Sequence, residues 1–223
     1  MRKSPLGLMV ALVATMNVVP AHAAITVSEV APWSSGNSAV SADWFELTNT
    51  GASAVNITGW KVDDSSASFA SSSALTGVTS IASGQSAIFI EGTGAANATF
   101  ISTWFGSSAP AGFVIGNYSG SGLGLSTGGD GVNIYNATGA LQASVSFGAS
   151  PASAPFATFD NAAGLTGSIS QLSVVGVNGA FMAMNASEIG SPGVISAVPE
   201  PTNLAMMLAG LGLIGVAFRK HTR

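Results

Sequence analysis

The heptapeptide LQASVSF, residues 141–147, shows most clearly what kind of structure this chain builds. In an extended chain its apolar residues, at every second position from Leu141 to Phe147, lie on one face, and the polar residues between them lie on the other. A period of two is typical of a strand that buries one face and leaves the other in water. The segment therefore predicts a half-buried β-strand.

Further strand-like runs follow one another along the chain, with clusters of Gly, Ser, Asn and Asp between them. The expected strands are 25–30, 43–49, 59–63, 87–90, 113–115, 131–135, 141–147 and 168–175. Residues 98–106 could form one short helix, and Asn136–Gly139 predicts a hairpin turn. Because no helical pattern of about 10–15 residues separates successive strands, the order argues against a parallel β-α-β sheet. It predicts an all-β protein built as an antiparallel β-sandwich.

Three segments rich in Ser, Ala and Gly interrupt this pattern, at residues 65–77, 118–131 and 149–157. Their side chains are small and polar, so we expect long surface loops there rather than core. The stretch of about 175 residues between the two ends of the chain is long enough for one domain with an ordinary core.

The charge and the side-chain chemistry of residues 24–198 exclude several classes of function. This stretch holds nine carboxylates and a single basic residue, Lys61, so its formal charge is −8. Binding of nucleic acid needs clustered Lys and Arg and is excluded on this ground. Both histidines, His22 and His221, lie in the end segments, and the chain has no cysteine. Catalysis by Ser-His-Asp or Cys-His groups, imidazole or thiolate metal sites and disulfides are therefore not expected, and neither is a cofactor.

The N-terminal end has the three parts of a secretory signal peptide. Arg2 and Lys3 precede an apolar stretch over residues 6–19, and small residues then occupy the two positions that a signal peptidase reads, Ala21 and Ala23. We therefore expect residues 1–23 to be a signal peptide that signal peptidase removes after Ala23. The protein is predicted to leave the cytoplasm.

The C-terminal end combines a Pro-Glu-Pro element, an apolar run over residues 204–218 and a basic tip. As a helix that run measures roughly 22 Å, short of the ~30 Å core of a bilayer. Residues 195–223 resemble the PEP-CTERM sorting signal of Gram-negative bacteria. The resemblance implies transient insertion in the inner membrane, cleavage by an exosortase and release toward a surface layer of exopolysaccharide. The sorting residues that it implies are Pro199, Glu200, Pro201, Arg219, Lys220 and Arg223. A permanent C-terminal anchor is the alternative.

A second resemblance covers most of residues 25–194. Its most specific pieces are DWFELTNTG at 43–51, ITGWKVDD at 57–64 and GSPG at 190–193. In these pieces Phe45 and Leu47 alternate toward a core, and Asn49–Gly51 turns the chain. The pieces are similar to those of the lamin-tail domain, which implies an immunoglobulin-like β-sandwich over residues 24–194. The serine-rich insert after Asp64 and the stretch 148–166 depart from that pattern.

Four tryptophans could form a platform on which sugar rings stack, namely Trp33, Trp44, Trp60 and Trp104. A sandwich without disulfides needs large buried side chains, so we expect most of the four to belong to the core. Trp33 and Trp104 lie near loop residues and are predicted to be the more exposed pair. They are therefore the candidate ligand-binding residues.

The carboxylates offer two further kinds of site. Asp63, Asp64 and Asp130, together with Asp43 and Glu46, could bind calcium outside the cell, but no loop has the ligand spacing of a calcium site, so no metal is expected.

A pair of carboxylates could instead hydrolyse glycosidic bonds, although nothing in the sequence fixes such a pair. The sequence thus predicts a non-enzymatic module that acts in adhesion, matrix structure or ligand binding, with exopolysaccharide or other surface proteins as partners. A carboxylate-dependent hydrolase of polysaccharide and a permanently anchored surface protein remain the alternatives.

Overall fold

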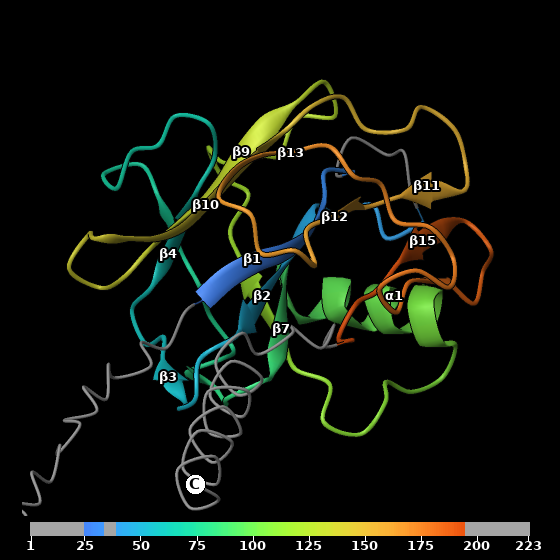
Figure 1. Cartoon of the computed structure of the whole chain (residues 1–223), viewed down its shortest axis with the longest axis horizontal. Coiled ribbons are helices and arrows are strands. Elements are labelled where there is room, and N and C mark those ends of the chain that lie inside the picture. Colours follow the sequence, from blue (N-terminus) through green and yellow to red (C-terminus); the bar gives the residue numbers. More distant parts are fainter. Residues whose placement is uncertain (1–24, 34–38, 195–223) are drawn as a thin grey trace, which may run out of the picture.

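The computed structural model describes residues 25–33 and 39–194, while residues 1–24, 34–38 and 195–223 lie outside this description. Within the described residues, two five-stranded sheets pack against each other, and two smaller sheets and one helix lie beside them (Figure 1). This arrangement confirms the predicted all-β, immunoglobulin-like sandwich.

Each of the two large sheets draws its strands from distant parts of the chain. The first has the order β12 (Phe159–Asp160), β1 (Ile25–Ala31), β2 (Trp44–Asn49), β7 (Ser86–Glu91) and β8 (Ile115–Tyr118). The second has the order β13 (Gly167–Ile169), β10 (Leu141–Phe147), β9 (Asp130–Tyr135), β4 (Lys61–Asp63) and β5 (Ser73–Ala74). The late strands β12 and β13 thus each form one edge of a sheet.

The smaller elements flank this sandwich. One small sheet joins β11 (Phe156–Ala157), β15 (Glu188–Gly190) and β14 (Phe181–Met182), and the other pairs β3 (Val55–Asn56) with β6 (Ser80–Ile81). The helix α1 (Gly94–Phe105) covers residues 98–105 of the short helix expected at 98–106 and begins four residues earlier. Within the described residues no helix is both long enough and apolar enough to cross a membrane.

Most neighbouring strands are antiparallel, but three pairs are parallel, namely β7 with β8, β10 with β13 and β11 with β15. The segment β7–α1–β8 is therefore one β-α-β unit, contrary to the sequence expectation. The reason is that a connection of more than about a dozen residues lets the chain cross over and return in parallel, and α1 forms part of this connection.

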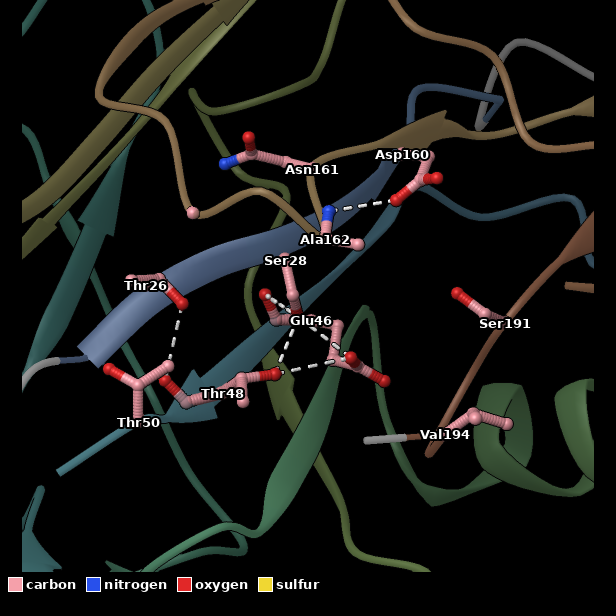
Figure 2. Close-up of a pocket in the computed structure, with 11 residues that line it drawn as sticks. Thr26, Ser28, Glu46, Thr48, Thr50, Asp160, Asn161, Ala162, Ser191 and Val194 are labelled. Carbon is pink, nitrogen blue, oxygen red and sulfur yellow. Dashed lines mark hydrogen bonds between the residues drawn. The ribbon is translucent and has the colours of Figure 1, made fainter. Parts of the chain in front are cut away.

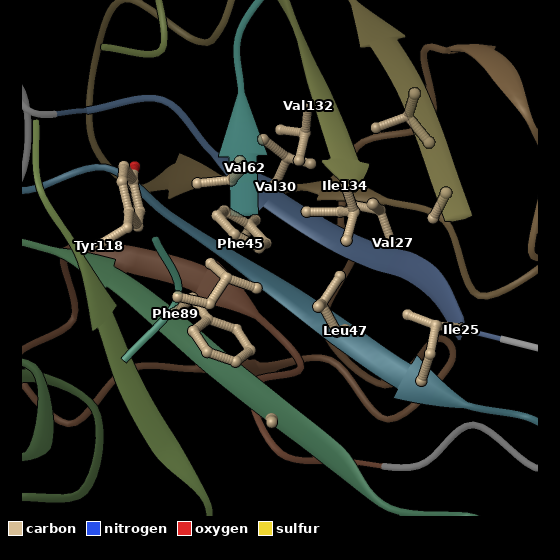
Figure 3. Close-up of a cluster of buried hydrophobic side chains, with 14 of the residues drawn as sticks. Ile25, Val27, Val30, Phe45, Leu47, Val62, Phe89, Tyr118, Val132 and Ile134 are labelled. Carbon is tan, nitrogen blue, oxygen red and sulfur yellow. The ribbon is translucent and has the colours of Figure 1, made fainter. Parts of the chain in front are cut away.

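The interior between the two large sheets is apolar (Figure 3). Val27, Phe45 and Leu47 from the first sheet and Val132 and Ile134 from the second are at most 1% exposed. The alternation of Phe45 and Leu47 toward the core is therefore confirmed. Burial of such side chains, at about 25 cal/mol per Å² of apolar surface, is what holds the two sheets together.

The first sheet is also covered on its outer face, so all six residues of β2 are buried. There α1 lies over Trp44, Ile88 and Ile90, whereas the second sheet lies on the opposite side (Figure 1). The Trp44 ring meets Phe100 and Trp104 of α1 edge to face, with centroid distances of 5.3 and 5.8 Å. The fold therefore has a second apolar cluster outside the sandwich.

Several local expectations need correction. Leu141 is 54% exposed although it begins the apolar face of β10, because the register shifts between Leu141 and Ala143. The predicted surface loops contribute three buried leucines to the core, Leu75, Leu123 and Leu125, which sit between short turns.

The hairpin expected at Asn136–Gly139 is confirmed: the Gly139 amide donates to the Asn136 carbonyl at 3.0 Å.

Two of the expected strands differ clearly from the structure in their bounds. The strand expected at 113–115 is β8 and begins only at Ile115. The strand expected at 168–175 is β13 and ends at Ile169, and Val174 and Val175 beyond it are more than half exposed.

Candidate functional site

Two glutamates face each other across neighbouring strands on the outer side of the first sheet. Glu29 of β1 pairs in register with Glu46 of β2, and a β-bulge lies just before Glu29. Since Phe45 and Leu47 point into the sandwich, Glu46 between them points outward. Yet Glu29 is 0% exposed and Glu46 is 1% exposed. The pair is therefore buried outside the main core.

Hydroxyl and amide groups surround the Glu29 carboxylate. The Ser191 backbone amide donates to Oε1 at 2.9 Å, and the Ser191 hydroxyl donates to Oε2 at 3.2 Å. The Thr158 hydroxyl also donates to Oε1. On the other side, Glu29 is paired in register with Asp160 of β12. Glu29 thus joins the first strand of the domain to residues near its end.

The Glu46 carboxylate makes corresponding contacts (Figure 2). The Ser28 hydroxyl donates to Oε1 at 2.7 Å, and the Thr48 hydroxyl reaches the same atom at 3.4 Å. The Gly193 amide donates to Oε2 at 2.6 Å. Glu29 and Glu46 therefore accept hydrogen bonds from the backbone amides of Ser191 and Gly193, which belong to the same short segment of the chain.

That segment is residues 190–194, which we call the C-terminal turn. The Val194 amide donates to the Ser191 carbonyl at 2.9 Å, and Gly193 has φ +74°. Proline at the second position and a glycine with positive φ at the third are what a type II turn requires. At Gly190 a Cβ atom would collide with Glu29 Oε1 and lie 2.9 Å from the Trp104 ring. The GSPG sequence therefore fits closely over the carboxylate pair.

Burial changes the protonation of both carboxyls. Loss of solvation raises the pKa of Glu29 from its ordinary 4.5 to about 8, and the nearby charge of Glu46 adds to the rise. Loss of solvation also raises the pKa of Glu46 to about 7, although hydrogen bonds from Ser28 and Gly193 oppose the rise. In the folded protein at neutral pH the pair therefore retains at least one proton.

A small pocket opens beside Glu46 (Figure 2). Its volume is about 20 Å³, which is room for a water molecule but not for a sugar ring. Its polar lining includes Thr26, Ser28, Thr48 and Asn161. The arrangement can hold a proton and order a water molecule, and it fixes the C-terminal turn to the sheet.

Comparison with known proteins identifies two parts of the chain. Residues 19–149 match the family described as Lamin Tail Domain. The chain belongs to the lamin tail domain family. Residues 197–221 match the PEP-CTERM protein-sorting motif, which indicates export to the cell surface through the inner membrane of a Gram-negative bacterium. No curated protein matches the chain.

In this lamin tail domain the tryptophans are core residues. Trp33 is 0% exposed and Trp104 is 2% exposed, so the prediction that they are the more exposed pair is wrong. The physical reason is the second apolar cluster: Trp33 packs against Phe156 at 5.9 Å, and Trp104 packs against Phe181 at 5.5 Å. Neither ring offers a face on which a sugar could stack.

The candidate calcium residues accept hydrogen bonds from loops. Asp63 accepts from the Ser68 amide at 2.6 Å, and Asp64 accepts from the Ser66 amide at 2.8 Å. Asp130 accepts from the Ser65 amide at 2.9 Å. Among the described residues, no group of three or more acidic side chains is arranged to hold a metal ion.

The processing residues predicted from the two ends lie outside the described part of the chain, so their roles stay predictions. They are Ala21, Ala23, Pro199, Glu200, Pro201, Arg219, Lys220 and Arg223.

Sequence reasoning missed the role of the buried pair. Glu46 was only one of several calcium candidates, and Glu29 was not singled out at all. A charged residue that alternates with apolar ones is ordinarily assigned to the solvent face of a strand. The usable signal was the family sequence itself, since the second glutamate stands inside DWFELTNTG and its amide donor inside GSPG.

Proposed function

We propose that this lamin tail domain is a non-enzymatic module, exported and sorted by an exosortase-type system, that acts in adhesion or in the structure of an extracellular matrix. The observation that carries the proposal is the position of the C-terminal turn. The turn ends at Val194, and the sorting motif begins at residue 197. Cleavage within the sorting motif would therefore leave every contact of Glu29 and Glu46 intact.

The buried pair argues against the alternative of a carboxylate-dependent hydrolase. Hydrolysis of a glycosidic bond needs two carboxyl groups that flank a sugar in a cleft. Here Glu29 is wholly buried and the pocket beside Glu46 holds about 20 Å³. The oxygens of both carboxylates also accept hydrogen bonds from the protein itself. This geometry favours a structural role for the pair.

We also propose that the domain extends over residues 24–194, beyond the family match that ends at residue 149. The later residues supply β12 to the first sheet and β13 to the second. They also supply Ser191 and Gly193 to the carboxylate pair. A chain cut at residue 149 would lack one edge strand of each sheet.

The test of sorting is made in the native host. Intact mass and cell fractionation are measured for the natural protein, for a variant that lacks Pro199–Pro201 and for a matched control, Asn203→Ala. We expect the natural protein and the control at the surface, without residues 1–23 and without the apolar run. The deletion variant should stay in the inner membrane with its tail. Undiminished export of that variant, or a surface protein that retains residues 204–223, would contradict the proposal.

The test of catalysis uses the purified surface protein and the exopolysaccharide of the host. We expect no release of reducing ends. Release that disappears in Glu46→Gln would establish the hydrolase instead.

A further inference from the structure

Three exposed valines lie together on one short loop that leads into β14. Val174, Val175 and Val177 are 54%, 53% and 43% exposed. Valine is among the side chains that folded proteins bury most often, and several exposed apolar side chains in one place mark an interaction surface. We call residues 174–179 the valine loop.

Hydrogen bonds of its own backbone hold the valine loop in a defined shape. The Val177 amide donates to the Val174 carbonyl at 2.9 Å, and the Ala180 amide donates to the Val177 carbonyl at 2.8 Å. Asn178 and Gly179 have φ values of +48° and +81°, which suit the second of these two tight turns. The fold therefore presents the valines to water on an ordered loop.

No exposed charge accompanies the valines along the chain. Residues 161–187 contain neither an acid nor a base. The acids that flank this stretch are buried, since Asp160 is 7% exposed and Glu188 is 0% exposed. The Asn178 side chain also donates to the Asp160 carboxylate at 2.8 Å. The valine loop is thus apolar and uncharged, although residues 24–198 together have a formal charge of −8.

The chain leaves the described part of the domain beside the valine loop. Val194 is the last described residue, and it packs on Gly179, where a Cβ atom would collide with Val194 Cγ1. The apolar run of the sorting segment begins at residue 204, so at most about 36 Å of extended chain separates it from Val194. While that run lies in the inner membrane, the valine loop is within reach of the outer lipid surface.

The tether and the charge decide between possible partners of the loop. Because the tail already keeps the domain at the membrane, contact of the valines with lipid is an intramolecular step, and a small apolar surface suffices for it. A second copy of the domain carries the same charge of −8 and is repelled. The apolar run of the same chain is itself surrounded by lipid. The lipid surface is therefore the partner that these observations favour.

We propose that the valine loop docks on the outer lipid surface of the inner membrane while the sorting segment is still attached. Docking holds the C-terminal turn, and with it the Pro-Glu-Pro element at 199–201, near the membrane. Removal of the tail ends the tethering, so the docked population falls and the domain is released. This proposal rests on the proposed sorting and deepens it by naming the surface of the domain that meets the membrane.

The test uses a single fluorescent probe, which the absence of cysteine from the chain allows. The unprocessed chain without residues 1–23 carries Val175→Cys, labelled with a polarity-sensitive dye, and is reconstituted in phosphatidylcholine vesicles. We expect emission at shorter wavelength than in water, and quenching by spin-labelled lipid. The matched control is Gln142→Cys, at an exposed position of β10, which lies on the other side of the domain from β15, the partner of β14 (Figure 1). Its emission should remain that of a dye in water.

A second labelled variant removes the other two valines. When Val174→Ser and Val177→Ser are added, the ratio of docked to undocked domain should fall on the order of tenfold, because the burial of two half-exposed valine side chains in lipid is lost. The hydrogen bonds that shape the loop use backbone atoms, so the variant should fold. An unchanged urea midpoint checks this.

The outcomes separate docking from sorting. If the chain floats with the vesicles but the dye at position 175 emits as in water, or if the double serine variant keeps the full shift, docking is rejected and the proposed sorting stands. A chain that does not float with the vesicles would reject both. If residues 24–198 alone, without vesicles, show a shift that grows with protein concentration, a second copy occupies the loop and the proposal is wrong.

Discussion

Stability of the domain should fall as the pH rises, because of the pair Glu29 and Glu46. Burial raises the folded-state pKa values to about 8 and about 7, whereas both carboxyls have ordinary values in the unfolded chain. The protonated forms therefore stabilise the folded state fully below about pH 4.5, and this stabilisation is lost as the pH rises toward about 8.

The size of the effect follows from the proton count. Between about pH 5 and pH 7 each carboxyl keeps a proton when folded and loses it when unfolded, which removes about 1.4 kcal/mol per pH unit. The two together would remove on the order of 5 kcal/mol over this range, a large part of the 5–15 kcal/mol typical of a domain. Residues 24–198 contain no histidine, so no imidazole of the domain adds to the slope.

Glutamine substitutions isolate the pair. Gln at position 29 can accept from the Ser191 amide with its oxygen and donate to the Ser191 hydroxyl with its nitrogen, so it imitates the protonated acid. Glu29→Gln should halve the slope of unfolding free energy against pH. The double variant with Glu46→Gln should be nearly flat.

Urea denaturation followed by tryptophan fluorescence at a series of pH values from about 5 to about 9 measures these slopes. A natural protein whose unfolding free energy does not change across this range would refute the reasoning. So would a Glu29→Gln variant that keeps the full slope.

Two further predictions concern packing. Gly190→Ala should destabilise the domain by about 1–3 kcal/mol, because the added methyl group collides with Glu29. Gly148→Ala is the control, since no atom lies within 4 Å of its Cβ position, and it should change the stability little. The urea midpoints of both variants measure the difference. Trp104→Ala should cost about 3–5 kcal/mol and lower the melting temperature, because it empties the second apolar cluster. Leu141→Ala, at a side chain 54% exposed, is its control, and an equal loss in both would contradict the packing described.

The sequence predicted the main strands of both large sheets, but it did not predict the layer that covers the outer face of the first sheet. The alternation of apolar and polar residues predicted β9, β10 and the hairpin between them, because one face of each strand packs on the core. Trp104 was misplaced because its partners come from β2 and β14, far away in the sequence. A short stretch of sequence does not show which distant segment of the chain will pack against it in the folded protein.

The same limitation hid the candidate site. An acid at position 46 in an alternating strand indicates a side chain that faces solvent, and the C-terminal turn, whose Gly193 amide donates to it, lies 147 positions later in the chain. Leucines inside the loop at 118–131 likewise belong to the core, although their neighbours are glycine and serine. The composition of residues 118–131 indicates a surface loop, but it does not show that Leu123 and Leu125 enter the core.

The contact between Glu29 and Ser191 joins positions that are 162 residues apart. A chain that crosses the membrane N-terminus first presents Glu29 long before its partner emerges, and in water that carboxyl is ionised. Folding must therefore take up a proton at the moment when the last part of the domain arrives. Only a few residues separate this last part of the domain from the start of the sorting motif at residue 197, so the pair can close only after the chain has been made almost as far as that motif.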